Sequence, residues 1–243
     1  MNYDHIGQMI TIKIAEYGDN LALRYKLNDS WASLTYKEFG EQIKNLACAM
    51  IRVGVKKGDS VGIFSANRYE WAVSDFACIL AGAVSVPIYA TNTKEQAQFI
   101  IKDAGIKLIF AGNEFQYQSL ADIHSEGVPL QIVSYEKEME TDASFTTPFE
   151  IFMNVEDQSE FISEMNHRSG QIKIDDVTTI IYTSGTTGNP KGVMLSHGNL
   201  FHQFEAVDAN FNVTSADTSL CFLPLSHVYE RMWSYYVYLK GAV

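Results

Sequence analysis

The chain has 243 residues, of which 47% are hydrophobic, which is enough for a sizeable core in one large domain or two smaller ones. Its 18 basic and 29 acidic residues give a formal net charge of −11, which disfavours a nucleic-acid groove and general binding to anionic membranes, although a local basic patch escapes that argument. The three cysteines, Cys48, Cys78 and Cys221, have no metal or redox spacing, so reduced core thiols and a cytoplasmic location are expected.

The chain shows no pattern of export or membrane insertion. Its N-terminus has no cationic region before an apolar stretch, which argues against a signal peptide. The longest apolar run, residues 76–90, is interrupted and shorter than the roughly 20 residues that a bilayer span needs. We therefore expect a soluble chain with at most peripheral membrane association.

The first fifty residues predict a helix, a hairpin and a second helix. Apolar residues at helical spacing indicate a helix over residues 4–17, and two strands, 21–26 and 31–36, follow around an Asn-Asp-Ser turn. Thr35 and Glu38 form a capping box, which starts an amphipathic helix that runs to Gly54.

Strands and helices then alternate. Asn67 is a candidate cap for the helix that begins near Glu70, and Thr93 starts a later helix with Gln96 in the capping-box position. The predicted strands are 61–64, 84–88, 107–110 and 130–133, and the predicted helices are 70–80, 93–104 and 113–124. This alternation predicts βαβ crossovers and an α/β fold with a largely parallel sheet flanked by helices.

Residues 134–165 interrupt the alternation with nine acidic residues against one base, Lys137. Dense carboxylates are most stable in water, so this segment is interpreted as a solvated connector and surface helix. We place a boundary near Asp175, between a first α/β subdomain of residues 1–174 and the start of a second subdomain, residues 175–243.

The most informative stretch is residues 178–199, TTIIYTSGTTGNPKGVMLSHGN. Two apolar runs, predicted as strands, flank a loop of glycines and hydroxyls that ends at Lys191. Such a loop suits phosphate, because glycine lets backbone N–H groups approach an anion while hydroxyls and an ammonium add hydrogen bonds and charge. The candidate phosphate-binding residues are Thr183, Ser184, Gly185, Thr186, Thr187, Gly188 and Lys191.

Two common phosphate loops are excluded by spacing. In a Walker loop the second glycine would stand at Pro190, and a dinucleotide fingerprint would open a helix directly, whereas a strand is predicted after Lys191. The stretch instead resembles the phosphate-binding signature of the adenylate-forming superfamily, which includes acyl-CoA synthetases, luciferases and peptide-synthetase adenylation domains. The alternative is a Gly/Thr-rich hairpin turn with an incidental lysine.

Residues 221–225 are predicted to form a strand, and His227 follows shortly after its end. From the residues alone, a structural role explains His227 better than a functional one. However, LPLSHVYER resembles the second signature of the acyl-CoA synthetases, which implies that His227 lies beside the carboxylate and the adenylate. His197 is interpreted as structural, and no hydrolase is predicted, because Ser184 lacks the nucleophile-elbow pattern.

The resemblance extends over most of the chain and is greatest to long-chain fatty acid–CoA ligases. It implies the N-terminal part of the adenylate-forming fold, cut within the second subdomain, and a reaction in which a fatty acid, ATP and CoA give acyl-CoA through acyl-AMP. It also implies that Lys191 and His227 are catalytic, and that Thr183 contributes a hydroxyl to Mg²⁺.

The family's Tyr-Gly-x-Thr-Glu and Thr-Gly-Asp motifs do not occur in the 243 residues, so these residues alone are expected to be inactive. Apolar surface and a sheet edge left exposed would then favour self-association. Two alternatives stay open: a non-catalytic nucleotide-binding module, and an adenylate-former for another carboxylate such as an aryl acid or an amino acid.

Overall fold

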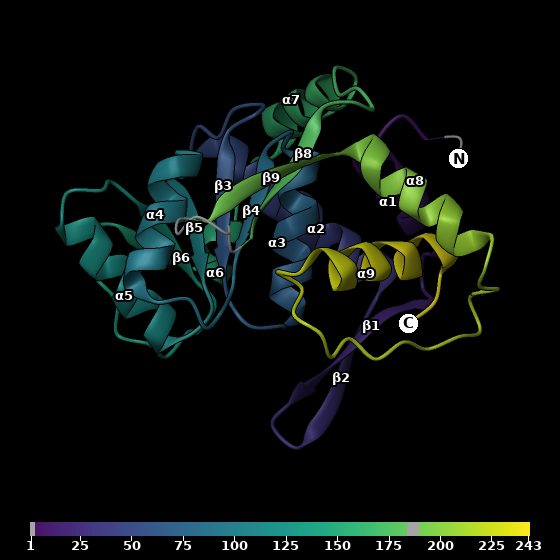
Figure 1. Cartoon of the computed structure of the whole chain (residues 1–243), viewed down its shortest axis with the longest axis horizontal. Coiled ribbons are helices and arrows are strands. Elements are labelled where there is room, and N and C mark those ends of the chain that lie inside the picture. The colour runs from purple at the N-terminus through teal and green to yellow at the C-terminus, as the bar shows by residue number, and fades with distance from the viewer. Residues whose placement is uncertain (1–2, 184–189) are drawn as a thin grey trace.

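The computed structural model describes residues 3–183 and 190–243. A seven-stranded sheet with the order β7-β6-β5-β3-β4-β8-β9 lies at its centre, and helices cover both faces (Figure 1). Among the described strands of this sheet, β9 alone runs antiparallel to its neighbour. The predicted α/β fold with a largely parallel sheet is therefore confirmed.

The elements follow the predicted order closely. The strands of the sheet are β3 (Ser60–Phe64), β4 (Val84–Ile88), β5 (Leu108–Ala111), β6 (Gln131–Ser134), β7 (Thr146–Pro148), β8 (Val177–Thr183) and β9 (Lys191–Ser196). The helices are α1 (Ile6–Tyr17), α2 (Tyr36–Arg52), α3 (Tyr69–Leu80), α4 (Lys94–Ala104), α5 (Glu114–Ser125), α6 (Phe149–Met153), α7 (Ser159–Ser169), α8 (His197–Asp208) and α9 (Val228–Lys240). A separate hairpin joins β1 (Leu21–Leu27) to β2 (Ser30–Thr35).

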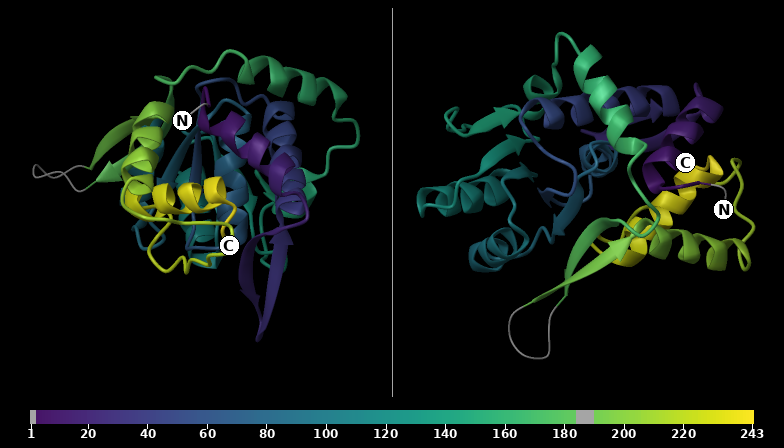
Figure 2. Two further views of the ribbon diagram at one scale, coloured as in Figure 1. Left: turned by 90° about the vertical axis from the view of Figure 1, so that its right-hand side faces the viewer. Right: turned by 90° about the horizontal axis from the view of Figure 1, so that it is seen from above.

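Alternating side chains of the central strands divide the core into two halves. In β5, Leu108 and Phe110 pack with α1, α2, α3 and α9, whereas Ile109 and Ala111 pack with α4 and α5 on the opposite face. This is the period-two alternation of a strand that is buried on both sides. The three layers are visible in Figures 1 and 2.

The capping residues define where the helices begin. The predicted boxes at Thr35 with Glu38 and at Thr93 with Gln96 are both present, and Ser196 forms a further capping box at the start of α8. Each cap satisfies backbone N–H groups that have no partner within the helix, which fixes the direction in which the helix leaves its strand.

One predicted cap is wrong. Arg68, not Asn67, is the N-cap residue of α3, and it makes no side-chain capping bond. The Asn67 amide is used at long range instead: its Nδ2 donates to Leu223 O at 2.6 Å and its Oδ1 accepts from Leu225 N at 2.8 Å. The sequence pattern of a helix cap cannot predict this role, because the partners lie more than 150 residues further along the chain.

The acidic segment 134–165 is more structured than expected. Its acidic side chains do lie at the surface, but the segment also supplies β7, which pairs in parallel with β6, and it buries Phe149 and Phe152. Because charged residues dominate the composition of this segment, its sequence pattern did not indicate the short strand β7 or the two buried phenylalanines.

A second correction concerns residues 221–225, which form no strand in the described chain. They run as irregular backbone in which Phe222 is 74% exposed, and they pair with none of the described strands. The outer edge of β9 has no described neighbour either, and Met194 on this strand is 65% exposed. Self-association through this surface stays a prediction.

Two further expectations can be compared with the structure. Cys48 and Cys78 are buried free thiols as expected, whereas Cys221 is an exposed free thiol and does not belong to the core. Within residues 3–183 and 190–243, none of the helices has the length and apolar character needed to cross a bilayer.

A buried pair of histidines joins the start of α1 to the start of α8. His197 begins α8, and its Nδ1 accepts a hydrogen bond from Ile6 N at 3.3 Å, while its ring lies edge-on to that of His5, with 5.7 Å between centroids. His5 Nε2 lies 3.2 Å from Ser169 Oγ. Burial, and then the proximity of His5, lower the pKa of His197 to about 4. Both rings act as neutral parts of the core, in agreement with the structural interpretation of His197.

We expect the protein to lose stability in mild acid because of this pair. Between pH 6.5 and about 4 the imidazole of His197 binds a proton in the unfolded chain but not in the folded one, so lowering the pH favours unfolding. The contribution of His197 amounts to about 2 kcal/mol between pH 7 and pH 5. In urea titrations, His197→Asn, which keeps an acceptor near the position of Nδ1, should show a smaller fall. An identical fall in both proteins would contradict the prediction.

Candidate functional site

The predicted phosphate loop connects β8 to β9. Thr183 and Lys191 are register partners at the end of this antiparallel pair, and both side chains are exposed. The candidate residues between them, Ser184, Gly185, Thr186, Thr187 and Gly188, lie outside the described residues. The structure therefore brings two of the predicted residues, one hydroxyl and one ammonium, together at the base of the loop.

The end of β8 is held in place by its own side chains. The Tyr182 hydroxyl donates to Asp103 Oδ2 at 2.5 Å, which ties the strand to α4. Burial, and then this carboxylate, raise the pKa of Tyr182, so the phenol stays protonated as a donor. Gly192 is the register partner of Tyr182, and a Cβ there would lie 2.9 Å from Ile180 Cγ2, so this glycine permits the close approach of the two strands.

Thr183 lies at the carboxyl edge of the sheet. Because β3, β4 and β8 are parallel, their carboxyl ends reach the same edge, which is where open α/β sheets bind ligands. Asn67, three residues after the end of β3, binds the backbone of Leu223 and Leu225 at this edge. The segment that precedes His227 is thus fastened to the edge at which the phosphate loop begins.

His227 is the N-cap residue of α9 and does not follow a strand as predicted. Its Nδ1 accepts a hydrogen bond from Tyr229 N at 3.2 Å, and its side chain is exposed. In a neutral ring that accepts at Nδ1, the proton is on Nε2, which is left to donate to a ligand. In residues 3–183 and 190–243, no hydrogen bond joins His227 to Thr183 or Lys191.

A fully buried ion pair fixes α9, one turn beyond His227. Arg231 Nε donates to Asp75 Oδ2 at 2.8 Å, and its Nη2 forms a second bond to Asp75 Oδ1. Its Nη1 donates to Thr179 Oγ1, which itself donates to Ser85 O at 2.8 Å. The Tyr235 hydroxyl also donates to Asp75. This network connects α9 with α3, β8 and β4.

The network is charged yet sealed from water. Burial alone would lower the pKa of Arg231, but the adjacent Asp75 and Tyr235 raise it, so the guanidinium stays charged. The ring of Trp71 lies 5.6 Å from Cζ of Arg231, within range of a cation–π contact. Sequence reasoning did not identify this group, although an Asp inside the apolar helix pattern WAVSDFACIL was an available signal, because buried charges require partners.

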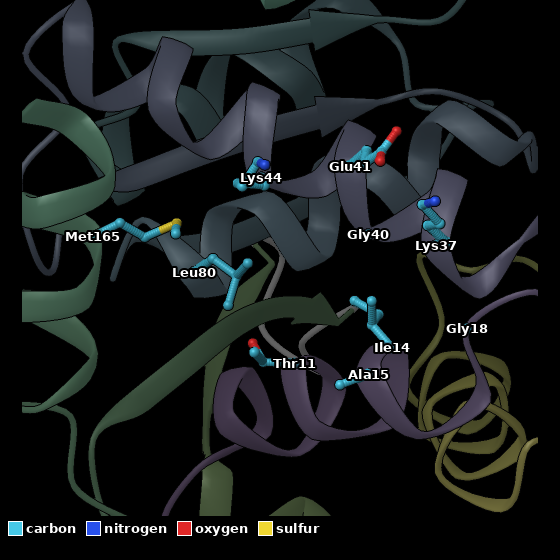
Figure 3. Close-up of a pocket in the computed structure, with 10 residues that line it drawn as sticks. All are labelled: Thr11, Ile14, Ala15, Gly18, Lys37, Gly40, Glu41, Lys44, Leu80 and Met165. Carbon is cyan, nitrogen blue, oxygen red and sulfur yellow. The ribbon is translucent and has the colours of Figure 1, made fainter. Parts of the chain in front are cut away.

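A groove between α1 and α2 lies away from Thr183, Lys191 and His227. It has a volume of about 420 Å³; Ile14, Leu80 and Met165 contribute apolar surface, and Lys37, Glu41 and Lys44 lie along α2 (Figure 3). It shares no residue with the predicted phosphate site. The described residues contain no group of three or more metal-ligating His, Cys, Asp or Glu side chains.

Comparison with known families identifies the family of the chain. The family model of AMP-binding enzymes matches residues 11–243. The chain belongs to the AMP-binding enzyme family. The resemblance to the adenylate-forming superfamily is thereby confirmed.

Two of the curated relatives within this family are named as long-chain-fatty-acid–CoA ligases. The chain is 32% identical to the long-chain-fatty-acid–CoA ligase FadD15 of Mycobacterium bovis over 94% of this chain and 38% of the relative. It is also 32% identical to the human long-chain-fatty-acid–CoA ligase ACSBG2, over 97% of this chain and 35% of the relative. The chain thus spans little more than a third of these relatives, in their N-terminal part.

Solved structures confirm the fold. The inhibitor-bound N-terminal domain of FACL13 from Mycobacterium tuberculosis matches 99% of this chain with a TM-score of 0.76 at 21% identity, and this chain covers 56% of it. The o-succinylbenzoate–CoA synthetase MenE of Bacillus subtilis, with a bound acyl-adenylate, matches 96% with a TM-score of 0.74 at 22% identity, and this chain covers 54% of it. The AMP-binding chain has the fold of the N-terminal domain of adenylate-forming enzymes.

We expect Arg231→Met to destabilise the chain by about 3–5 kcal/mol, because it leaves the carboxylate of Asp75 buried with Tyr235 as its remaining described side-chain donor. Lys240→Met on the same helix is the matched control, since its ion pair with Asp208 is partly exposed and worth less than about 1 kcal/mol. Urea unfolding of both variants measures the difference, and similar losses would contradict the structural role of the buried pair.

Proposed function

We propose that the chain provides the phosphate-binding part of an enzyme that activates a long-chain fatty acid with ATP and transfers the acyl group from acyl-AMP to CoA. The main support is the hairpin β8–β9, which contains residues that resemble the phosphate-binding signature of the family and sets Thr183 opposite Lys191 at the carboxyl edge of the sheet. The preference for long-chain fatty acids is supported by the names of the relatives, which are about 30% identical.

The chemistry explains why these residue types are needed. A carboxylate has no adequate leaving group, and transfer of an adenylyl group from ATP converts it into a mixed anhydride that CoA can attack. Charge builds up on the phosphates as pyrophosphate leaves, and donors fixed beforehand stabilise that charge. Lys191 would supply the ammonium, and the hydroxyls and backbone amides of residues 184–188 would supply neutral donors.

ATP would bind as its magnesium complex. Mg²⁺ prefers oxygen ligands and is usually held by substrate phosphates with few protein groups. The Thr183 hydroxyl is exposed at the end of β8, so it is free to serve as one of these oxygens. The ion would neutralise phosphate charge alongside Lys191.

His227 would orient the fatty acid carboxylate. A carboxylate is already ionised near pH 7, so no general base is needed to activate it. The Nε2–H of a ring held by its Nδ1 can instead donate to a carboxylate or adenylate oxygen. The ion pair of Arg231 with Asp75 would keep this donor in position from within the same helix.

We also propose that residues 1–174 and residues 175–243 belong to two subdomains, and that the enzyme acts in the cytoplasm. The boundary falls just before β8, which pairs with β4 through Ser85 and Thr179. We propose that the 243 residues bind Mg-ATP by themselves. Because they lack the Tyr-Gly-x-Thr-Glu and Thr-Gly-Asp motifs, we propose that this binding occurs without turnover.

Binding of Mg-ATP should depend on Lys191. We expect Lys191→Ala to weaken binding by about 10- to 100-fold, which corresponds to the loss of a hydrogen bond to a charged group. Isothermal titration calorimetry measures the change, with Lys173→Ala, another exposed lysine that precedes β8, as the matched control. Equal affinities of the two variants would contradict the role of Lys191.

A pyrophosphate-exchange assay separates the remaining alternatives. Exchange driven by palmitate but not by benzoate or amino acids, in a protein that contains these residues and both missing motifs, is the expected result. Preference for benzoate or an amino acid would indicate another adenylate-former. Absence of exchange with every carboxylate would leave a non-catalytic nucleotide-binding module. Robust exchange by the 243 residues alone would contradict their proposed inactivity.

A further inference from the structure

The hairpin of β1 and β2 extends away from the body of the molecule (Figures 1 and 2). Its two strands pair with each other and with no other described strand. The turn at its tip contains Asn28, whose positive φ of 54° is tolerated by asparagine better than by most residues. The hairpin is an appendage whose outer face does not contribute to the core.

One face of the hairpin combines an exposed indole with two cations. Trp31 is 54% exposed and is the register partner of Lys26, whose Nζ lies 4.6 Å from the centre of the ring. Arg24, two residues earlier on the same face, places Cζ 5.5 Å from the same ring. We call Arg24, Lys26 and Trp31 the aromatic–cationic face.

The two cations of this face have no acidic partner. No ion pair or side-chain hydrogen bond of Arg24 or Lys26 occurs in the described part of the chain, and the one acid in the hairpin is Asp29 in its turn. The chain has a formal net charge of −11, so two unpaired cations beside an exposed indole make this face locally positive within an acidic protein. A positive face with an exposed indole is suited to a partner that is negatively charged and can also contact apolar surface.

A phospholipid surface with anionic headgroups has both properties. Indole rings favour the boundary between headgroups and acyl chains, where the apolar body is buried and the N–H stays hydrated. Lysine and arginine stems lie along the same boundary while their charged ends reach the phosphates. A narrow projecting hairpin can reach this boundary while the acidic body of the protein stays in water.

We propose that the aromatic–cationic face of the β1–β2 hairpin docks on the surface of anionic membranes. Docking requires neither ATP nor CoA, so it goes beyond the proposed function and can be tested apart from it. It would bring the protein to the phase in which long-chain amphiphiles concentrate. It also locates the basic patch that the overall charge of the chain does not predict.

Vesicle flotation tests the proposal with the 243-residue chain and no nucleotide. The chain should bind phosphatidylcholine vesicles that contain phosphatidylglycerol, and it should bind pure phosphatidylcholine vesicles much less. Arg24→Gln combined with Lys26→Gln should lower the partition coefficient about 30-fold, the effect of two cations at roughly 1 kcal/mol each. High salt should also weaken binding of the unaltered chain, because at 1 M salt the screening length falls to about 3 Å and the attraction between the cations and the headgroups is reduced.

Matched substitutions separate this face from general surface effects. Trp31→Ala should weaken binding, whereas Phe115→Ala, at a side chain that is also 54% exposed, should not. Lys102→Gln combined with Lys107→Gln removes the same charge from exposed sites elsewhere and should leave binding unchanged. Circular dichroism checks that each variant is folded.

Three results would overturn the proposal. The first is failure of the unaltered chain to bind anionic vesicles. The second is equal binding by the hairpin variants and their matched controls. The third is Trp31-dependent binding of a single-stranded oligonucleotide in place of vesicles. None of them bears on the proposed function, since none involves acyl activation.

Discussion

The buried ion pair between Arg231 and Asp75 is the interaction on which the arrangement of the site depends. Removing two charges from water costs more than a single contact returns, so such a pair is stable only when every lone pair and N–H group is used. Here the main donors reach Asp75 and Thr179, and Thr179 in turn binds the backbone of β4. Hydrogen bonds that link α9, α3, β8 and β4 together offset the free energy of desolvating the two charges. Because all four elements must be in place for these bonds to form, they fix the position of α9.

Much of the fold could be predicted because local rules and long-range packing agreed. Thr35 and Thr93 cap their helices as their spacing indicates, and the alternation of strands and helices indicated a parallel sheet. The predictions failed where distant partners override local preference. Asn67 resembled a cap but binds residues 223 and 225, and the apolar residues of 221–225 resembled a strand but have no neighbour to pair with. Propensity contains no information about such partners.

The candidate site was predictable in its chemistry but not in its geometry. The composition of the loop identified a phosphate ligand, and the register of β8 with β9 adds that Thr183 and Lys191 face each other. The resemblance directed attention to His227, and the structure adds that its Nδ1 is occupied by the cap of α9. The fold is retained in solved structures of adenylate-forming enzymes at 21–22% identity.

The same ion pair has a consequence during synthesis on the ribosome. Asp75 and Arg231 are 156 residues apart, so at about 5–20 residues per second the carboxylate waits roughly 8 to 30 s for its partner. During that interval α3 cannot bury Asp75 as an ion, and the face of the sheet that α9 will cover stays open. The region around Asp75 is therefore expected to reach its final packing only after α9 has emerged.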